Sequence, residues 1–63
     1  MTDADRLARL RHDLANPLSA ILIETQLILL RSEELPPDIA AALKDVETAA
    51  VRMRTILQEF SAG

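Results

Sequence analysis

The sequence predicts an all-α protein, an antiparallel hairpin of two helices that dimerises into a four-helix bundle. Three observations lead to this class. Apolar side chains recur three and four residues apart along two long segments, and the adjacent prolines Pro36 and Pro37 separate those segments. The chain of 63 residues has a single aromatic side chain, so leucine, isoleucine, alanine and valine must form any core, which suits helix packing. We expect residues 1–63 to form one domain.

The first helix is predicted over residues 3–31. Pro17 lies inside its apolar stripe, and two interpretations compete. Asn16 caps a new helix that starts at Pro17, or one helix runs through and is kinked there. Apolar residues on both sides of Pro17 keep the same angular phase, which favours one kinked helix. The stripe expected to be buried consists of Leu7, Leu10, Leu14, Leu18, Ile21, Leu22, Ile28 and Leu29.

The second helix is predicted over residues 37–60, after a turn at 32–36. Pro37 suits the first turn of a helix, and Asp38 is favourable at its positive end. So short a turn makes the helices antiparallel neighbours, and one hairpin cannot hide both stripes, so we expect a twofold dimer. The second stripe has the spacing of a bundle or coiled coil and consists of Ile39, Leu43, Val46, Ala50, Met53, Leu57 and Phe60, widened by Ala42, Ala49 and Ile56.

Composition excludes several classes of function. The net charge is −3 with acids and bases interspersed, which is not the pattern of a nucleic-acid-binding protein. The most apolar run, residues 18–30, is too short for a membrane span and contains Glu24 and Gln26. A cytoplasmic protein without membrane contact is therefore expected. With one histidine and no cysteine we expect no bound metal.

A polar group surrounds the single histidine. With Leu14 at the centre of the buried stripe, His12 and Asn16 lie one turn apart on the opposite side, and Asp13 lies on the flank. A neutral imidazole is a nucleophile, a carboxylate can take up its proton, and an amide can hold water or a phosphoryl oxygen. A lone exposed histidine is most often only solvated. The hypothesis that His12 is a nucleophile therefore depends on its combination with Asp13 and Asn16. The chain has no phosphate-binding glycine loop, so the phosphoryl donor must be another domain.

A second apolar stripe runs below the histidine and consists of Ile23, Leu27 and Leu30, with Ser19 on the same outward line. Exposed apolar patches of this kind usually mark a docking surface. The alternative is that these residues are additional core of a larger or rotated bundle.

Residues 12–18, H-D-L-A-N-P-L, resemble the phosphoacceptor box of bacterial sensor histidine kinases. In that box the histidine is followed by an acid, two variable residues, threonine or asparagine, proline and leucine. The turn prolines and the second helix are similar to the rest of that family's dimerisation and histidine-phosphotransfer domain. The resemblance implies that His12 accepts the γ-phosphoryl group of ATP and passes it to an aspartate of a response-regulator receiver. It also implies that Asp13 is the general base and that Asn16 positions a phosphoryl group or a water.

The resemblance further implies that Pro17 supplies a kink that lets the helix bend, and that the chain is a homodimer. Ser19 and Ile23 would lie on a surface shared by the catalytic and receiver domains, and we expect Leu27, Leu30 and Arg11 to extend it. Arg11 replaces a serine frequent in the family and either contacts phosphate or is solvated.

The chain contains no ATP-binding catalytic domain, so ATP and magnesium would bind elsewhere and the chain would not phosphorylate itself. We expect it to be part of a larger kinase. The alternatives are a purely structural dimerisation hairpin with a silent histidine and a free-standing histidine phosphotransfer protein.

Overall fold

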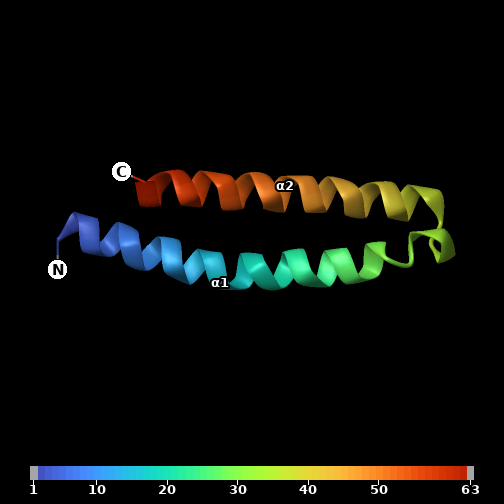
Figure 1. Ribbon diagram of the computed structural model, residues 1–63, viewed down its shortest axis with the longest axis horizontal. Coiled ribbons are helices and arrows are strands. Elements are labelled where there is room, and N and C mark those ends of the chain that lie inside the picture. The colour runs from blue at the N-terminus through green and yellow to red at the C-terminus, as the bar shows by residue number, and fades with distance from the viewer. Residues whose placement is uncertain (1, 63) are drawn as a thin grey trace.

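The computed structural model describes residues 2–62, and the side chains of residues 2–59. Helix α1 spans Asp3–Leu29, a short 3₁₀ helix (η1) spans Ser32–Glu34, and helix α2 spans Pro37–Ala62. The two long helices lie side by side in opposite directions and form a rod of 49 × 15 × 14 Å (Figure 1). The predicted all-α antiparallel hairpin is confirmed. Helix α1 ends two residues earlier than expected, and α2 continues two residues further.

A capping box starts helix α1. The Thr2 hydroxyl accepts a hydrogen bond from the backbone N–H of Asp5 at 3.1 Å, and the Asp5 carboxylate accepts one from the backbone N–H of Thr2 at 3.2 Å. Two N–H groups at this helix start thereby gain partners. Asp3 and Asp5 also place negative charge in the first turn, at the positive end of the helix dipole. These local interactions explain why α1 begins at Asp3.

Replacing Thr2 with alanine is expected to lower the free energy of unfolding by about 1 kcal/mol, because the N-cap acceptor is lost. Thr48→Ala is the matched control, since the Thr48 hydroxyl only donates to the carbonyl of Lys44 inside a helix, where alanine is the better helix former. Urea denaturation at one fixed protein concentration measures both variants. Equal losses in the two variants would contradict the capping assignment.

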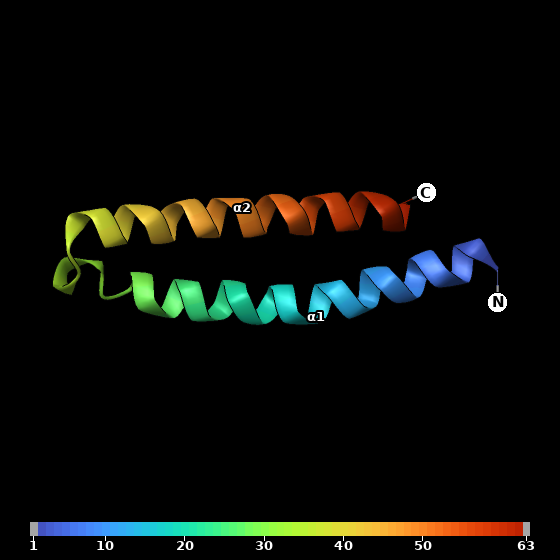
Figure 2. The same ribbon diagram turned by 180° about the vertical axis from the view of Figure 1, so that it is seen from behind.

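Helix α1 runs through Pro17 without interruption, which confirms one helix rather than two. Proline has no N–H, so the carbonyl of Asp13 cannot accept the usual helical hydrogen bond from residue 17. Figures 1 and 2 show the axis of α1 changing direction in this region. The predicted kink therefore lies in the part of α1 that contains Pro17, five residues after His12.

The turn is closed by prolines and by short-range hydrogen bonds. The N–H of Glu34 donates to the carbonyl of Arg31 at 2.9 Å, which forms the 3₁₀ helix. The carbonyl of Pro36 then accepts from the N–H groups of Ile39 and Ala40, both at 3.0 Å. Pro37 occupies the first position of α2, where its missing N–H leaves no helical hydrogen bond unmade.

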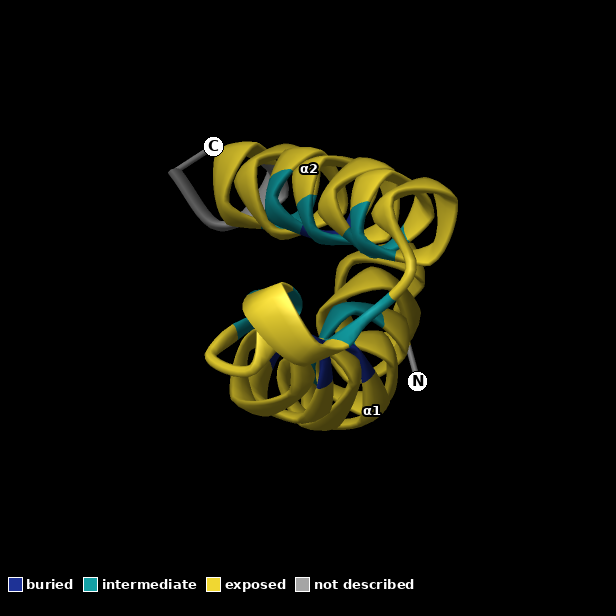
Figure 3. Ribbon diagram, turned by 90° about the vertical axis from the view of Figure 1, so that its right-hand side faces the viewer, coloured by how far each residue is buried: buried dark blue, intermediate teal, exposed yellow. Residues whose placement is uncertain are grey.

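The core between the helices is small. Its buried apolar members are Leu18, Leu22 and Ala50, with Val51 and Leu57 packed against them. The fully packed zone thus lies in the middle of the rod, and Figure 3 shows the buried and half-buried residues on the facing sides of the two helices. The inward-facing positions are residues 11, 15, 18, 22, 25 and 29 of α1 and residues 40, 43, 47, 50, 51 and 57 of α2.

Thr25 is the buried polar residue of this core. Its hydroxyl donates to the carbonyl of Ile21 at 2.6 Å, so its burial leaves no polar group without a partner.

Each predicted stripe is divided between two faces in the single hairpin, in line with the expectation that one hairpin cannot hide both stripes. Leu18 and Leu22 face α2, whereas Ile21 and Leu14 are 49% and 42% exposed. A stripe that alternates three and four residues apart is wide enough for two neighbours, and one partner helix covers only half of it. The exposed half, here called the open apolar face, consists of Leu7, Leu10, Leu14, Ile21 and Ile28 of α1 and Ile39, Val46, Met53 and Ile56 of α2. Phe60 lies outside the described side chains.

Both rows of the open apolar face lie on one side of the hairpin. Ile21 directly precedes the buried Leu22, and Val46 directly precedes the half-buried Glu47. The same angular offset on two antiparallel helices points to the same side of the pair. The hairpin thus leaves one continuous apolar side uncovered.

Candidate phosphoacceptor site

His12 lies on the side opposite to the open apolar face. It directly follows the half-buried Arg11, as Ser19 follows the buried Leu18 and Ile23 follows the buried Leu22. The residue directly after an inward position is rotated about 100° to one side of the helix, and the residue directly before it is rotated about 100° to the other side. The His12 side chain is exposed. A partner covering the open apolar face would therefore leave His12 accessible.

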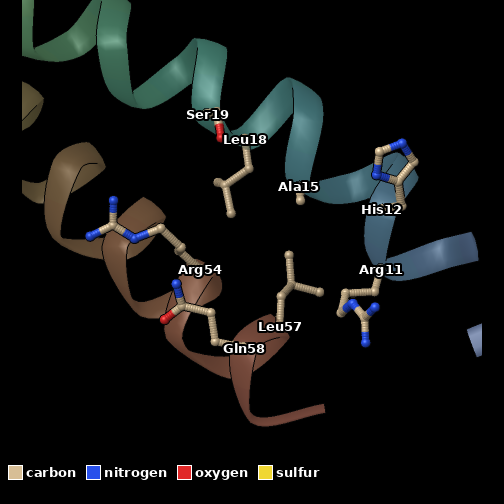
Figure 4. Close-up of a pocket in the computed structure, with 8 residues that line it drawn as sticks. All are labelled: Arg11, His12, Ala15, Leu18, Ser19, Arg54, Leu57 and Gln58. Carbon is tan, nitrogen blue, oxygen red and sulfur yellow. The ribbon is translucent and has the colours of Figure 1, made fainter. Parts of the chain in front are cut away.

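A groove between α1 and α2 begins beside His12. It has a volume of about 280 Å³ and is lined by Arg11, His12, Ala15, Leu18, Ser19, Arg54, Leu57 and Gln58. Figure 4 shows Leu57 between the two helices and the His12 ring at the α1 rim, turned away from Leu57. Arg11 and Arg54 lie on opposite sides of Leu57 in this view. The imidazole is thus at the edge of a hollow whose walls come from both helices.

The groove carries positive charge. Its eight lining residues, all described by the structure, include two arginines and no carboxylate. Ser19 and Gln58 add a hydroxyl and an amide that can donate hydrogen bonds. Leu18 at the floor is only 5% exposed, so part of the lining is apolar. This arrangement suits an anion, although the chain as a whole has a net charge of −3.

The predicted site residues fall into two groups. Arg11, His12 and Ser19 line the groove, and Arg11 is half-buried there rather than fully solvated. Asp13 and Asn16 are exposed but do not line it. Asn16 follows His12 by one turn on the same side of α1, whereas Asp13 is rotated by about 100° toward the flank.

The second apolar stripe is exposed along its length. Ile23 is 58% exposed, Leu27 55% and Leu30 82%, so the hairpin itself does not bury them as core. Together with Gln26 they line a shallow hollow on the same side of α1 as His12.

Sequence reasoning missed the contribution of α2 to this site. Arg54 and Gln58 reach the groove because the register of the hairpin brings residues near 54–58 opposite residues 11–19. Arg54 lies between Ala50 and Leu57 in the row that repeats every seven residues, but Glu47 lies in the same way between Leu43 and Ala50, so this row does not single out Arg54. The predicted stripe instead passed through Met53.

Among residues 2–62, no three potential metal ligands come together. In the same part of the chain, neither helix combines the length and the apolar character that a bilayer crossing requires.

Comparison with protein families gives one match. Residues 4–62 match the His Kinase A (phospho-acceptor) domain. The matched segment contains both helices, the turn and every residue of the groove. Searches of curated proteins and of solved structures found no match.

Proposed function

The chain belongs to the His Kinase A phospho-acceptor domain family, and on this basis we propose that His12 receives the phosphoryl group. Members of this family are the phosphoacceptor and dimerisation modules of histidine kinases. His12 is the only histidine in the sequence, so it is the one imidazole available as the nucleophile. Its exposure on the side opposite to the open apolar face is the observation that carries the proposal. Two hairpins can pair through that face while both histidines stay accessible.

The phosphorylation step is a displacement at phosphorus. An imidazole nitrogen of His12 attacks the γ-phosphorus of ATP, which a separate catalytic domain holds with magnesium. The new P–N bond forms as the bond to the bridging oxygen breaks, and ADP leaves with that electron pair. The proton of the imidazole passes to the Asp13 carboxylate, the adjacent residue in α1, which is exposed and acts as general base.

Transfer to a receiver domain runs through the same nitrogen. A carboxylate oxygen of the receiver attacks phosphorus, the P–N bond breaks with its electron pair going to the imidazole nitrogen, and the imidazole takes up a proton from the Asp13 carboxyl or from water. Asn16, one turn after His12 on the same side of α1, holds a phosphoryl oxygen during transfer or a water during hydrolysis. Neither step needs a metal or cofactor bound by this chain.

Both partners would dock on the exposed surface beside and below His12. This surface extends along one side of α1 and consists of Ser19, Ile23, Leu27 and Leu30, with Arg11 at the end nearest the N-terminus. The three apolar residues are more than half exposed, and covering them would contribute hydrophobic stabilisation to a complex. Because the catalytic and receiver domains would share this surface, they would bind one at a time.

The proposal is tested by phosphorylation in trans. The chain is incubated with a histidine-kinase catalytic domain, magnesium and γ-labelled ATP, and a receiver is added afterwards. We expect acid-labile label on the chain, followed by its loss to the receiver. An unlabelled chain in the presence of a donor that labels its own partner would favour a structural hairpin with a silent histidine.

Replacing Pro17 with alanine is expected to stabilise the hairpin while slowing its reactions. Alanine restores the hydrogen bond to the Asp13 carbonyl and removes a local cost of about 3 kcal/mol, so thermal unfolding should move to higher temperature. A straighter, stiffer α1 should lower both the labelling rate and the transfer rate several-fold. Thermal denaturation and labelling time courses measure the two effects. Higher stability with unchanged rates would remove the proposed role of the kink.

A further inference from the structure

We propose that Arg11 and Arg54, one from each helix, form an anion site that holds the phosphoryl group at His12. This inference rests on the proposed function and adds residues of α2 to the site. It names Arg54 as a positioning residue for phosphoryl transfer, with Gln58 as a second polar partner. The observation behind it is the groove that these residues share with His12.

The chemistry of the lining fits a phosphoryl group. A guanidinium presents planar N–H donors that match phosphate oxygens two at a time. The two arginines flank Leu57, and no lining residue is a carboxylate that would compete for them. The groove volume of about 280 Å³ is many times the roughly 10–15 Å³ that one water needs in a cavity, so a phosphoryl group fits with its hydration. Partial burial of Arg11 against apolar residues strengthens its interaction with an anion.

Phosphorylation would change the position of Arg54. In Figure 4 the guanidinium groups of Arg54 and Arg11 both point away from His12. The Arg54 side chain is exposed and can change rotamer. A phosphoryl group on His12 brings negative charge to the rim of the groove and attracts it. Because Arg54 belongs to α2 and His12 to α1, this contact links the two helices. Phosphorylated His12 should therefore stabilise the hairpin, in addition to being its reactive group.

The chain contains a matched control for each arginine. Arg52 is also an exposed arginine of α2, two residues from Arg54, but it does not line the groove. On α1, Arg9 lies two residues before Arg11, is exposed, and does not line the groove. Arg54→Gln and Arg52→Gln change the net charge equally, as do Arg11→Gln and Arg9→Gln. Differences within each pair therefore report the groove rather than the overall charge.

The test uses phosphoramidate, a small donor that needs no docking surface. An imidazole nitrogen attacks its phosphorus, the new P–N bond forms, and the old P–N bond breaks to release ammonia after protonation. The rate is measured over a range of donor concentrations for the wild type and the four variants. We expect Arg54→Gln and Arg11→Gln each to lower the rate at low donor concentration about tenfold, with Arg52→Gln and Arg9→Gln close to wild type.

A second readout separates anion binding from a structural role. Thermal unfolding is measured before and after phosphorylation for wild type, Arg54→Gln and Arg52→Gln. The wild type and Arg52→Gln should unfold at a higher temperature when phosphorylated. For Arg54→Gln, phosphorylation should not raise the unfolding temperature, and its unphosphorylated form should unfold at the same temperature as the unphosphorylated wild type. Arg54→Lys should restore part of it, because lysine keeps the charge without the planar fork.

The outcomes distinguish this inference from the proposed function. Wild-type chain labelled on His12, with Arg54→Gln equal to Arg52→Gln in both readouts, would overturn the anion site and leave the phosphoacceptor role intact. Wild-type chain that neither phosphoramidate nor the catalytic domain labels would overturn both.

Discussion

Replacing His12 with glutamine is expected to abolish phosphorylation of the chain. Glutamine offers no nucleophilic nitrogen, and the sequence has no second histidine to replace the first. The labelling rate should fall at least about a thousandfold, the scale of removing a nucleophile from its site. Labelling by a catalytic domain in trans and by phosphoramidate both measure the loss.

The His12→Gln variant should otherwise behave like the wild type. The side chain is exposed on the side away from the open apolar face, so the free energy of unfolding should change by no more than about 0.5 kcal/mol. Helix content and oligomeric state serve as controls. Label that persists on a folded, dimeric variant would show that another residue accepts the phosphoryl group.

Replacing Ile21 with aspartate is expected to dissociate the dimer. Ile21 is half exposed in the hairpin and belongs to the open apolar face, which we propose pairs with its copy. Twofold symmetry places the new carboxylate in the interface twice, where it has no partner. The dimer dissociation constant should rise at least about a hundredfold, the effect of a few kcal/mol.

Loss of the dimer should also reduce helix content. Among residues 2–59, the buried apolar residues of the core between α1 and α2 are only Leu18, Leu22 and Ala50, which is a small core for a hairpin of this length. Sedimentation over a range of concentrations measures the oligomeric state, and circular dichroism the helix content.

Ile23 provides the matched control for this prediction. It is an isoleucine of the same helix, 58% exposed against 49% for Ile21, but it lies on the His12 side. Ile23→Asp makes the same chemical change and should leave the dimer intact. Dissociation by Ile23→Asp and not by Ile21→Asp would place the dimer interface on the His12 side of the hairpin. It would contradict pairing through the open apolar face.

The helices and the turn could be predicted from the sequence because their signals are local. Pro36 and Pro37 end one helix and start the next through fixed backbone geometry. The continuous helix through Pro17 followed from the phase of Leu14 and Leu18 on either side. The division of each apolar stripe did not follow, because spacing shows which residues share an arc but not which neighbour covers each half. Leu43 faces α1 while Val46 remains 44% exposed, although both fit the same repeat.

The residues of the candidate site could be predicted where they belong to a single helix. The spacing of His12, Asn16 and Ser19 placed them near one another on α1, as the structure has them. Arg54 and Gln58 could not be assigned, because their approach to His12 depends on the register of α2 against α1. That register is set by the turn and by packing around Leu18 and Ala50. No local motif in the sequence of α2 indicates it.

Locating the phosphoryl group on the wild-type chain tests the role of His12 directly. The chain is phosphorylated in trans, kept at neutral or alkaline pH, and fragmented for mass spectrometry. The phosphoacceptor role of His12 predicts a single modification, on this residue, that is lost on brief acid treatment. An acid-stable modification on a serine or threonine, or an unmodified chain beside a donor that modifies its own partner, would contradict it.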